Sequence, residues 1–240
     1  IKNNYAYVDS SSSEIIKKER GTLTEPGIKS KDRERLPDES LKIFEQMKQG
    51  KFDDGEYVLR LKIDMSSPNI NMRDPVIYRI KKVEHHRTKN EWCIYPMYDF
   101  THCISDAIEN ITHSLCTLEF EDHRDLYEWV IEKINHENQP QQIEFARLAL
   151  EHNLMSKRKL NELVEKKYVE GWDDPRMPTL SGMKRRGYTP NAIKDFCNRI
   201  GITKKNSAIE MGVLENTIRE ELNLTAKRVM GVLDPIKVTL

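Results

Sequence analysis

The sequence predicts an α/β protein, and two patterns lead to this prediction. Residues 92–150 alternate strand, helix, strand, helix and strand, which is typical of an α/β unit with a mainly parallel sheet. After Leu154 the pattern changes to short helices, which indicates a separate helical region. A length of 240 residues fits one large domain or two unequal ones, and 38% apolar residues are enough for a sizeable core.

The region before residue 92 carries both helical and strand patterns. Ser10–Ser13 can cap a short helix that Gly21 ends, and Pro37 begins a second helix that stops near Gly50. Alternating apolar residues then predict two strands, with Pro68 in the loop between them. The expected elements are helices over 14–20 and 37–50, a loop over 21–37, and strands over 57–63 and 76–80.

The later elements follow from the same signals. Pro96 ends a strand, and Asp122 is expected to cap a helix whose apolar residues share one face. Residues 229–240 look β-like and stop in mid-strand. Because the chain also lacks an initiator Met, we expect it to be the interior of a longer protein. The expected elements are strands over 92–95, 114–120 and 143–150 and helices over 101–110, 122–134, 156–167, 179–186, 189–200 and 207–223.

Composition and motifs exclude several classes of protein. No apolar run approaches the roughly 18 residues of a membrane span, and neither a P-loop nor a Gly-x-Gly-x-x-Gly motif is present. The four cysteines form no C-x-x-C pair and are typical of reduced thiols in a cytosolic protein. His85, His86 and His102 lack partners at metal-ligand spacing, so we expect no resident metal.

Charge is unevenly distributed although the net charge is zero. Residues 104–151 contain 11 acids and 3 bases, whereas residues 154–199 contain 11 bases and 6 acids. A basic stretch beside an acidic one fits a polyanionic partner, and solvated helix faces are the alternative. Residues 154–160 are the most informative part of the basic stretch. Ser156 and three consecutive basic residues stand where a helix begins, and they offer the N–H groups, hydroxyl and ammonium charges that phosphate oxygens bind.

Several runs of residues resemble class I aminoacyl-tRNA synthetases. Residues 155–159, Met-Ser-Lys-Arg-Lys, look like the Lys-Met-Ser-Lys-Ser signature loop of that family. Residues 169–176, Val-Glu-Gly-Trp-Asp-Asp-Pro-Arg, are similar to a run in its glutaminyl and glutamyl branch. Residues 95–106 and 112–120 closely resemble the glutaminyl members. The resemblance covers the chain from Tyr7 to the end, and its several long matches in order make it specific.

The resemblance has one departure and implies a domain organisation. The family's His-Ile-Gly-His motif, which lies near the N-terminus and helps to hold ATP, does not occur here, and the C-terminal anticodon-reading barrels are missing. The chain therefore looks like the second half of a Rossmann-like catalytic domain with neighbouring parts. The expected domains are an inserted α+β acceptor-binding domain over 1–91, the catalytic half with its signature loop over 92–160, a helical subdomain over 161–228 and the start of a β-barrel over 229–240.

The resemblance also implies a reaction in two steps. The carboxylate of L-glutamine attacks the α-phosphate of ATP, which enters with Mg2+ as a substrate, and a ribose hydroxyl of tRNA(Gln) then attacks the adenylate carbonyl. Neither step needs a covalent enzyme intermediate, so catalysis should come from positioning and charge stabilisation. We expect a cytoplasmic monomer without membrane contact, and an isolated fragment without ligase activity. Two alternatives remain, a glutamyl-tRNA synthetase of the archaeal or eukaryotic type and a tRNA-binding fragment with no catalytic role.

Roles carried over from the family fall into three groups. Lys157 is the expected catalytic residue, because its ammonium group can stabilise phosphate charge. The nucleotide-binding residues implied are Thr117, Arg147, Leu148, Met155, Ser156 and Lys157. The glutamine-binding residues implied are Tyr98, His102, Ser114, Cys116 and Gln142. Arg147 has a structural salt bridge as its alternative role, and Tyr98 a place in the core.

For tRNA, the resemblance places Leu23 in a loop that wedges the first acceptor pair apart, where an apolar side chain can stack on the exposed pair. Pro68 and Ile70 match a segment that reads the minor groove. Asp122 matches a carboxylate on the acceptor stem, where it can accept from a guanine amino group. A further segment matches the contact with the inner corner of the tRNA, and its residues are Thr203, Lys204, Lys205 and Glu210.

Overall fold

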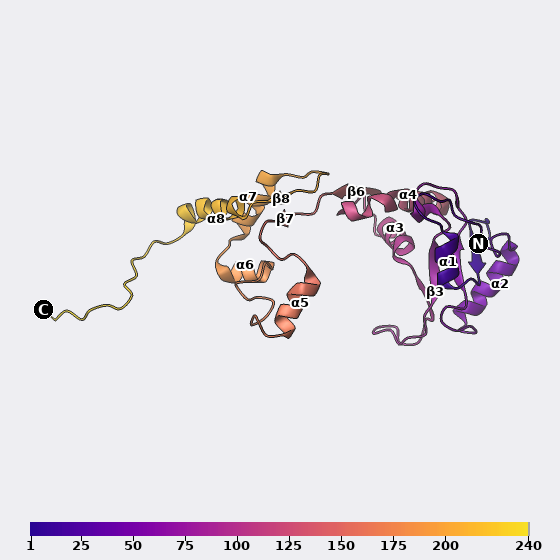
Figure 1. The fold of residues 1–240 in the computed structure, drawn as a ribbon, viewed down its shortest axis with the longest axis horizontal. Helices are drawn as coiled ribbons and strands as arrows, with labels where there is room; N and C mark the ends of the chain where they lie inside the picture. The colour runs from indigo at the N-terminus through magenta and orange to yellow at the C-terminus, as the bar shows by residue number, and fades with distance from the viewer. Residues whose placement is uncertain (240) are drawn as a thin grey trace. The chain divides into compact units, whose positions relative to one another are not determined.

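The computed structural model describes residues 1–239, which separate into two compact units. Unit 1 runs from Ile1 to Glu144 and unit 2 begins at Phe145. In Figure 1 the colours from indigo to pink follow unit 1, and those from salmon to yellow follow unit 2. Both units mix helices with strands, in agreement with the α/β class that the sequence predicts.

Unit 1 is built on a four-stranded antiparallel sheet with the order β1-β2-β3-β4. The sequence patterns found three of these strands but missed β1, which is fully buried and therefore lacks an alternating pattern. The strands are β1 (Ala6–Asp9), β2 (Val58–Leu61), β3 (Val76–Ile80) and β4 (Ile94–Pro96).

The mainly parallel sheet expected over 92–150 is wrong for its first strand. Ile94 of β4 lies opposite Ile80 of β3 in antiparallel register. The connection over 81–93 folds back on itself through a bridge between His85 and Lys89. A parallel pair needs a longer crossover, usually a helix, so this short connection favours antiparallel pairing.

Helices cover the sheet of unit 1 and complete its core. Contacts join α2 to β1, α3 to β3 and α3 to α4. The helices are α1 (Ser13–Glu19), α2 (Pro37–Lys48), α3 (Tyr98–Ile108) and α4 (Arg124–Ile134). The inward faces of α2, α3 and α4 bury apolar side chains in the core, for example Met47, Ala107, Leu126 and Val130 with Val8, whereas α1 buries none.

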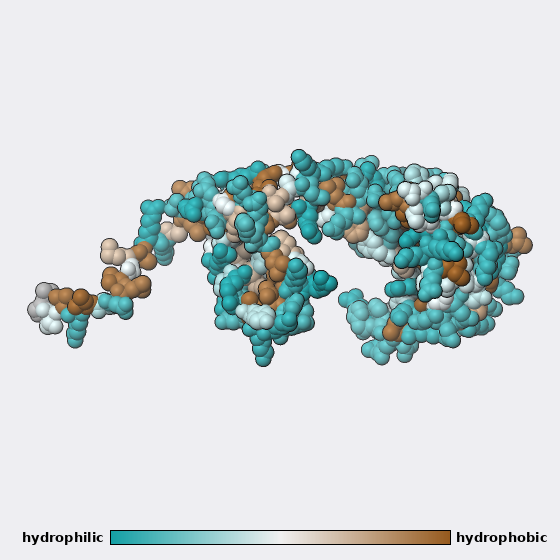
Figure 2. Space-filling view, in the orientation of Figure 1, coloured by the Kyte–Doolittle hydropathy of each residue, from teal (hydrophilic) through white to brown (hydrophobic). Residues whose placement is uncertain are grey.

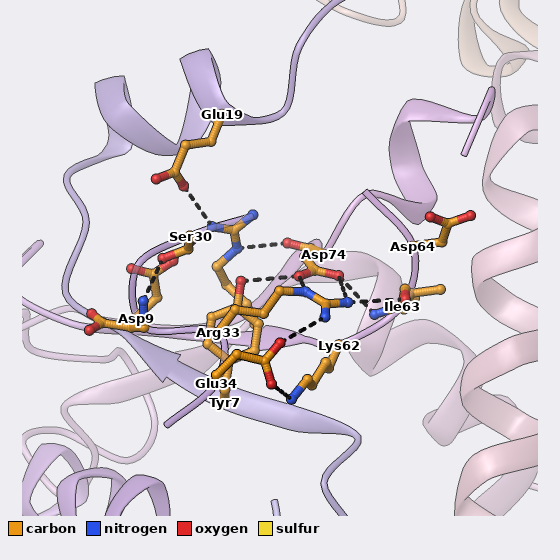
Figure 3. A network of polar contacts seen from close by, with 12 residues as sticks. Tyr7, Asp9, Glu19, Ser30, Arg33, Glu34, Lys62, Ile63, Asp64 and Asp74 are labelled. Carbon is orange, nitrogen blue, oxygen red and sulfur yellow. Dashed lines mark hydrogen bonds and ion pairs between the residues drawn. The ribbon is translucent and has the colours of Figure 1, made fainter. Parts of the chain in front are cut away.

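A buried polar network ties the first strand to the connection between β2 and β3 (Figure 3). Arg60 is fully buried and donates to the carboxylate of Asp9 (2.7 Å) and to the carbonyl of Asp74 (2.8 Å). The Asp74 carboxylate accepts from Arg33 (2.6 Å) and Tyr7 (3.2 Å). Burial alone would raise the pKa of Asp9, but the hydrogen bond from Arg60 lowers it overall. Charged groups remain buried here because each has a partner.

The last part of unit 1 is a two-stranded sheet of β5 (His113–Thr117) and β6 (Gln141–Phe145) with η2 (Leu118–His123) between β5 and α4. The strand expected over 114–120 therefore ends at Thr117, because the chain turns into the 3-10 helix η2. The expected cap of the next helix is also wrong. The N-cap is His123, and Asp122 lies one residue earlier.

Unit 2 holds the helical region. The strand expected over 143–150 is broken, and its end, β7, pairs in parallel with β8, which the sequence placed in a helix. Two small apolar clusters form the core, one around Phe196 and Leu214 and one around Leu160 and Met177. The elements are β7 (Ala149–Leu150), α5 (Lys157–Glu165), α6 (Leu180–Arg186), α7 (Pro190–Ile200), β8 (Ala208–Ile209) and α8 (Met211–Thr225).

Residues 226–239 contain no helix or strand, in contrast to the β-like pattern of the sequence from 229 onward; residue 240 of that prediction lies outside the described residues. Apolar side chains of this segment are exposed, including Met230 (93%) and Leu233 (92%). They form much of the brown colour near the C-terminal end in Figure 2, whereas hydrophilic residues dominate the visible surface elsewhere. Within residues 1–239, no helix has both the length and the apolar character that crossing a membrane requires.

Candidate functional site

Leu23 stands at the tip of a closed loop in unit 1, and its side chain is 81% exposed. The Thr22 hydroxyl accepts hydrogen bonds from the backbone N–H of Thr24 (3.3 Å) and Glu25 (3.1 Å). The Thr22 N–H in turn donates to the carbonyl of Glu25 (3.1 Å). This turn displays the leucine to solvent, whereas a leucine is normally buried. We call residues 20–27 the Leu23 loop.

Two other segments predicted to contact tRNA meet in space. Asn69, which lies between Pro68 and Ile70, donates from its side-chain amide to the carbonyl of Asp122 (2.7 Å) and to the carboxylate of Asp125 (2.9 Å). Pro68 and Asp122 are exposed, and Ile70 is half-buried at the start of η1 (Ile70–Met72). The structure therefore presents residues separated by more than fifty positions as neighbouring surface.

A cluster of aromatic rings surrounds Tyr98 at the start of α3. The ring of Tyr98 stacks on His102, with centroids 5.2 Å apart and planes 25° from parallel, and Phe120 lies 5.6 Å away. Tyr98 is 53% exposed, so about half of its surface is open to solvent, and the alternative of a half-buried core tyrosine stays open. Partial burial raises the pKa of its phenol, which keeps the hydroxyl protonated and able to donate.

A polar network fixes the histidine beneath that ring. The Ser114 hydroxyl contacts Nε2 of His102 (3.1 Å) and donates to the carboxylate of Asp106 (2.6 Å). Tyr127 donates to the same carboxylate oxygen of Asp106 (2.8 Å). Burial raises the pKa of Tyr127, as does its hydrogen bond to Asp106, so the phenol stays a donor.

Side chains from β5 and β6 also belong to the cluster around Tyr98. The Gln142 amide donates to the carbonyl of Phe120 and to the carboxylate of Glu144, both at 2.9 Å. Glu144 is 1% exposed and forms a two-point ion pair with Arg124, whose Nε donates over 2.9 Å. That guanidinium holds the pKa of Glu144 at about 2. Burial raises the pKa of the Cys116 thiol, which keeps it neutral beside this pair.

The remaining nucleotide-binding candidates lie mostly in unit 2. Thr117 ends β5 of unit 1, whereas Met155 and Ser156 immediately precede α5 and Lys157 is its first residue. Met155 is 42% exposed, and the side chains of Ser156 and Lys157 are also exposed. The exposed Lys157 side chain has room to change its conformation. An ammonium group needs this freedom if it is to follow the charge on phosphate oxygens.

Arg147 and Leu148 share a small cleft with the segment predicted to touch the inner corner of tRNA. Thr203 also lines this cleft, and its carbonyl accepts from the N–H of Ala146 over 2.7 Å. The Thr203 hydroxyl accepts from the N–H of Lys205 (3.1 Å), which closes a turn around Lys204. Glu210 is the exposed N-cap residue of α8.

The residues quoted for the family resemblance near 169–176 have a structural role in unit 2. Asp174 is 2% exposed. Its carboxylate accepts hydrogen bonds from the backbone N–H of Glu170, from the backbone N–H of Arg176 and from Nε of Arg176, each at a distance of 2.9 Å. Gly182 packs directly on this turn, since a Cβ there would lie 2.6 Å from the Asp174 carbonyl. These contacts give Asp174, Arg176 and Gly182 a structural role in holding this turn.

Comparison with known proteins decides the family. Residues 1–224 match the family of class I tRNA synthetases (E and Q), catalytic domain. The chain belongs to this family. Leu23, Lys157 and the cluster around Tyr98 therefore all lie within a class I synthetase catalytic domain.

Several relatives of this synthetase domain are glutamine–tRNA ligases. It is 60% identical over all 240 residues to the glutamine–tRNA ligases of Tolumonas auensis and Shigella boydii, and equally to that of Escherichia coli. The domain spans 43% of the length of these relatives. A solved glutamate-tRNA synthetase from Elizabethkingia anophelis resembles it in fold, with a TM-score of 0.54 and 16% identity over 92% of this chain and 51% of that one. The 60% identity to glutamine–tRNA ligases means that the alternative of a glutamyl-tRNA synthetase is not favoured.

Sequence reasoning missed four residues of the cluster around Tyr98, and they are Asp106, Arg124, Tyr127 and Glu144. Two signals were available. Asp106 follows His102 at the i,i+4 spacing of one helix face, and Glu144 follows Gln142 at the two-residue spacing of one strand face. Arg124 and Tyr127 carry no comparable signal, because their contacts cross from α4 to other elements.

Proposed function

We propose that the protein containing this synthetase domain ligates L-glutamine to tRNA(Gln), using ATP with Mg2+ and passing through a glutaminyl-adenylate. The observation that carries the proposal is the 60% identity to glutamine–tRNA ligases over every residue of the chain. Family membership supports an ATP-dependent reaction, and the arrangement of side chains supports a division of roles.

Lys157 acts on the nucleotide. When the glutamine carboxylate attacks the α-phosphate, the bond to the pyrophosphate group breaks and negative charge gathers on the departing oxygens. An exposed ammonium group at the start of α5 can follow that charge and stabilise it. Met155 and Ser156 complete the loop, while Thr117, Arg147 and Leu148 bind the nucleotide. In the second step a ribose hydroxyl of tRNA attacks the adenylate carbonyl and AMP leaves.

The cluster around Tyr98 receives the glutamine side chain. The basic side chains of this cluster already face carboxylates: Arg124 pairs with Glu144, His102 lies 3.2 Å from Asp106, and His123 lies 2.7 Å from Asp99. A substrate carboxylate would have to compete with these carboxylates for the same basic groups, whereas a neutral amide needs only hydrogen-bond donors and acceptors. Tyr98, Ser114, Cys116 and Gln142 offer such neutral groups, so the cluster favours glutamine over glutamate.

The tRNA is bound by two surfaces. In unit 1, Leu23 contacts the first acceptor pair, and Pro68, Ile70 and Asp122 contact the acceptor stem. The Asn69–Asp122 hydrogen bond supports this assignment, because it makes the last three residues neighbours. In unit 2, a surface of Thr203, Lys204, Lys205 and Glu210 contacts the tRNA backbone.

The domain organisation belongs to the same proposal. Residues 1–91 bind the acceptor end, 92–160 supply half of the catalytic domain, 161–228 form the helical subdomain and 229–240 lead into a barrel. We place the reaction in the cytoplasm, with the protein acting as a monomer.

Aminoacylation by the full-length protein, with glutamine and glutamate compared in parallel, tests the proposal. We expect charging of tRNA(Gln) with glutamine, and a kcat/KM for glutamate lower by on the order of 10⁴, as for sites built around specific hydrogen bonds. His102→Ala should narrow that ratio, while His113→Ala, an exposed histidine on β5, should leave it unchanged. Equal charging with glutamate would reject the assignment.

A further inference from the structure

Arg73 reaches from the end of η1 into the Leu23 loop and holds it from within. The residue is 3% exposed. Its Nη1 donates to three backbone carbonyls of the loop, those of Arg20 (2.9 Å), Thr22 (2.8 Å) and Glu25 (2.8 Å). Its Nε donates to the carbonyl of Ser67 (2.6 Å), the residue before Pro68. One guanidinium thus joins both sides of the Leu23 loop to Ser67, the residue that leads into the segment over 68–70.

The residue that follows Arg73 is anchored in the buried network. Asp74 has a left-handed backbone, with φ of 44°, and is 1% exposed. As Figure 3 shows, its carboxylate is held by Arg33, Tyr7 and the N–H of Ile63 (2.8 Å). The backbone directly after Arg73 is therefore fixed by contacts that do not involve the Leu23 loop.

Both ends of the Leu23 loop are also restrained. Gly21 has φ of 74°, and a Cβ at this residue would lie 2.7 Å from the Glu25 carbonyl. At the other end, the N–H of Gly27 donates to the Met65 carbonyl (2.7 Å), and a Cβ there would lie 2.8 Å from the same oxygen. These glycines let the two strands of the loop close tightly onto Arg73.

We propose that Arg73 is a positioning residue for acceptor-end opening. It holds the exposed Leu23 in a fixed relation to the segment over 68–70, so that the wedge and the groove-contacting surface engage one tRNA end together. The inference rests on the proposed function, because it deepens the role of Leu23 in tRNA binding. Its physical basis is entropy: a loop that is already ordered does not lose conformational freedom when the tRNA arrives.

Lysine cannot replace this arginine. The guanidinium carries N–H donors on separate nitrogens: Nη1 faces the three carbonyls of the Leu23 loop, while Nε donates to the Ser67 carbonyl. An ammonium group has all its donors on one nitrogen, so it cannot bind both segments at once. Arg73→Lys thus keeps the charge while it releases part of the loop.

The experiment compares two tRNAs in the full-length protein at saturating glutamine and ATP. One tRNA has an intact first acceptor pair, and the other has that pair mismatched, so that opening it costs less. For Arg73→Lys we expect charging of the intact tRNA to fall by roughly ten-fold, the scale set by the lost burial of one leucine. Charging of the mismatched tRNA should fall much less, and KM for glutamine should not change.

Arg35→Lys is the matched control. Arg35 is a half-buried arginine that donates to the Val8 carbonyl and to the Asp32 carboxylate, both at 2.7 Å, rather than to the Leu23 loop or to Asp74. This control variant should lower the melting temperature of the protein, and any loss in charging should be equal for the two tRNAs. The double variant Leu23→Ala/Arg73→Lys should be no worse on the intact tRNA than Leu23→Ala alone, because the arginine acts through the leucine.

The outcomes distinguish a failure of the role proposed for Arg73 from a failure of the proposed function. Equal losses on both tRNAs, or additive losses in the double variant, overturn the role of Arg73 while glutamine charging by the wild type stands. If the wild type charges neither tRNA with glutamine, the proposed function is wrong and the inference falls with it. If Arg73→Lys does not fold, Thr22→Val takes its place, because it removes the exposed hydroxyl that closes the turn. A selective loss on the intact tRNA supports the inference, and an unselective one overturns it.

Discussion

The side-chain amide of Asn69 donates to the backbone carbonyl of Asp122 over 2.7 Å, and this hydrogen bond joins the two segments that we propose to contact the acceptor stem. Asn69 caps η1 next to Pro68, whereas Asp122 lies in η2 just ahead of α4. The same amide donates to the Asp125 carboxylate (2.9 Å), and Asn71 adds a second donor to the Asp122 carbonyl (3.2 Å). The position of Asp122, for which we propose a tRNA contact, thus depends on a residue 53 positions earlier in the chain.

Asn69→Asp tests this link. The substitution keeps the side-chain oxygen that caps η1 but removes the amide donor and places a carboxylate beside Asp125. Each lost hydrogen bond is worth roughly 0.5–1.5 kcal/mol, so KM for tRNA should rise by roughly several-fold while KM for glutamine stays constant. Asn71→Ala, which leaves the Asn69 contacts intact, should have the smaller effect. An unchanged KM for tRNA in Asn69→Asp would show that the link does not orient the surface.

Lys157→Ala should slow adenylate formation and leave tRNA affinity nearly unchanged. Loss of one preorganised donor typically costs about 2.7–4 kcal/mol, or roughly 10²–10³ in rate. Glutamine-dependent pyrophosphate exchange, measured with tRNA present, reports this step. Lys166→Ala is the control, because Lys166 is an exposed lysine at the far end of α5 that pairs with Glu162 (2.6 Å). Wild-type exchange in Lys157→Ala would remove the signature loop from the mechanism.

Leu23→Ala should weaken charging of a tRNA whose first acceptor pair is intact. Full burial of a leucine is worth about 1.5–3 kcal/mol, so the loss should be roughly ten-fold or more. A tRNA with a mismatched first pair should be affected less, because its end opens without help. Ile28→Ala offers a control, since Ile28 is 67% exposed just beyond the same loop. If both tRNAs lose equally, Leu23 has no part in opening the pair.

Stability at low pH should depend on Glu144. Its folded-state pKa of about 2 lies below the ordinary value of 4.5, so the unfolded chain takes up a proton first as the pH falls. The Glu144–Arg124 pair therefore stabilises the fold fully above about pH 4.5, and this contribution is lost as the pH falls toward 2. In urea unfolding between pH 6 and pH 3, Glu144→Gln should show a shallower loss of stability than the wild type.

Glu137→Gln is the control for that series, because it removes an exposed carboxylate of unit 1. It should follow the wild-type curve. A Glu144→Gln curve parallel to the wild type would mean that the ion pair with Arg124 does not control acid unfolding.

The sequence by itself determined much of the secondary structure and the family. Helices such as α2 and α7 carry a proline at their first residue, so their starts are local properties of the chain. The runs around residues 95–106, 112–120 and 155–159 were sufficient to identify a class I synthetase. Local patterns failed where pairing decided the structure: β1 is buried, β8 has two residues, and η2 replaced the end of a strand.

Only the tertiary structure decided which side chains meet. Glu144 reaches Arg124 across two elements, Asn69 reaches Asp122, and Arg73 gathers carbonyls from residues 48 to 53 positions away. A sequence pattern reports the period of one helix or strand, whereas these contacts depend on how separate elements pack. Of these residues, only Asp122 was predicted from the sequence to have a functional role, because the partners and the burial of the others follow from the packing of distant segments.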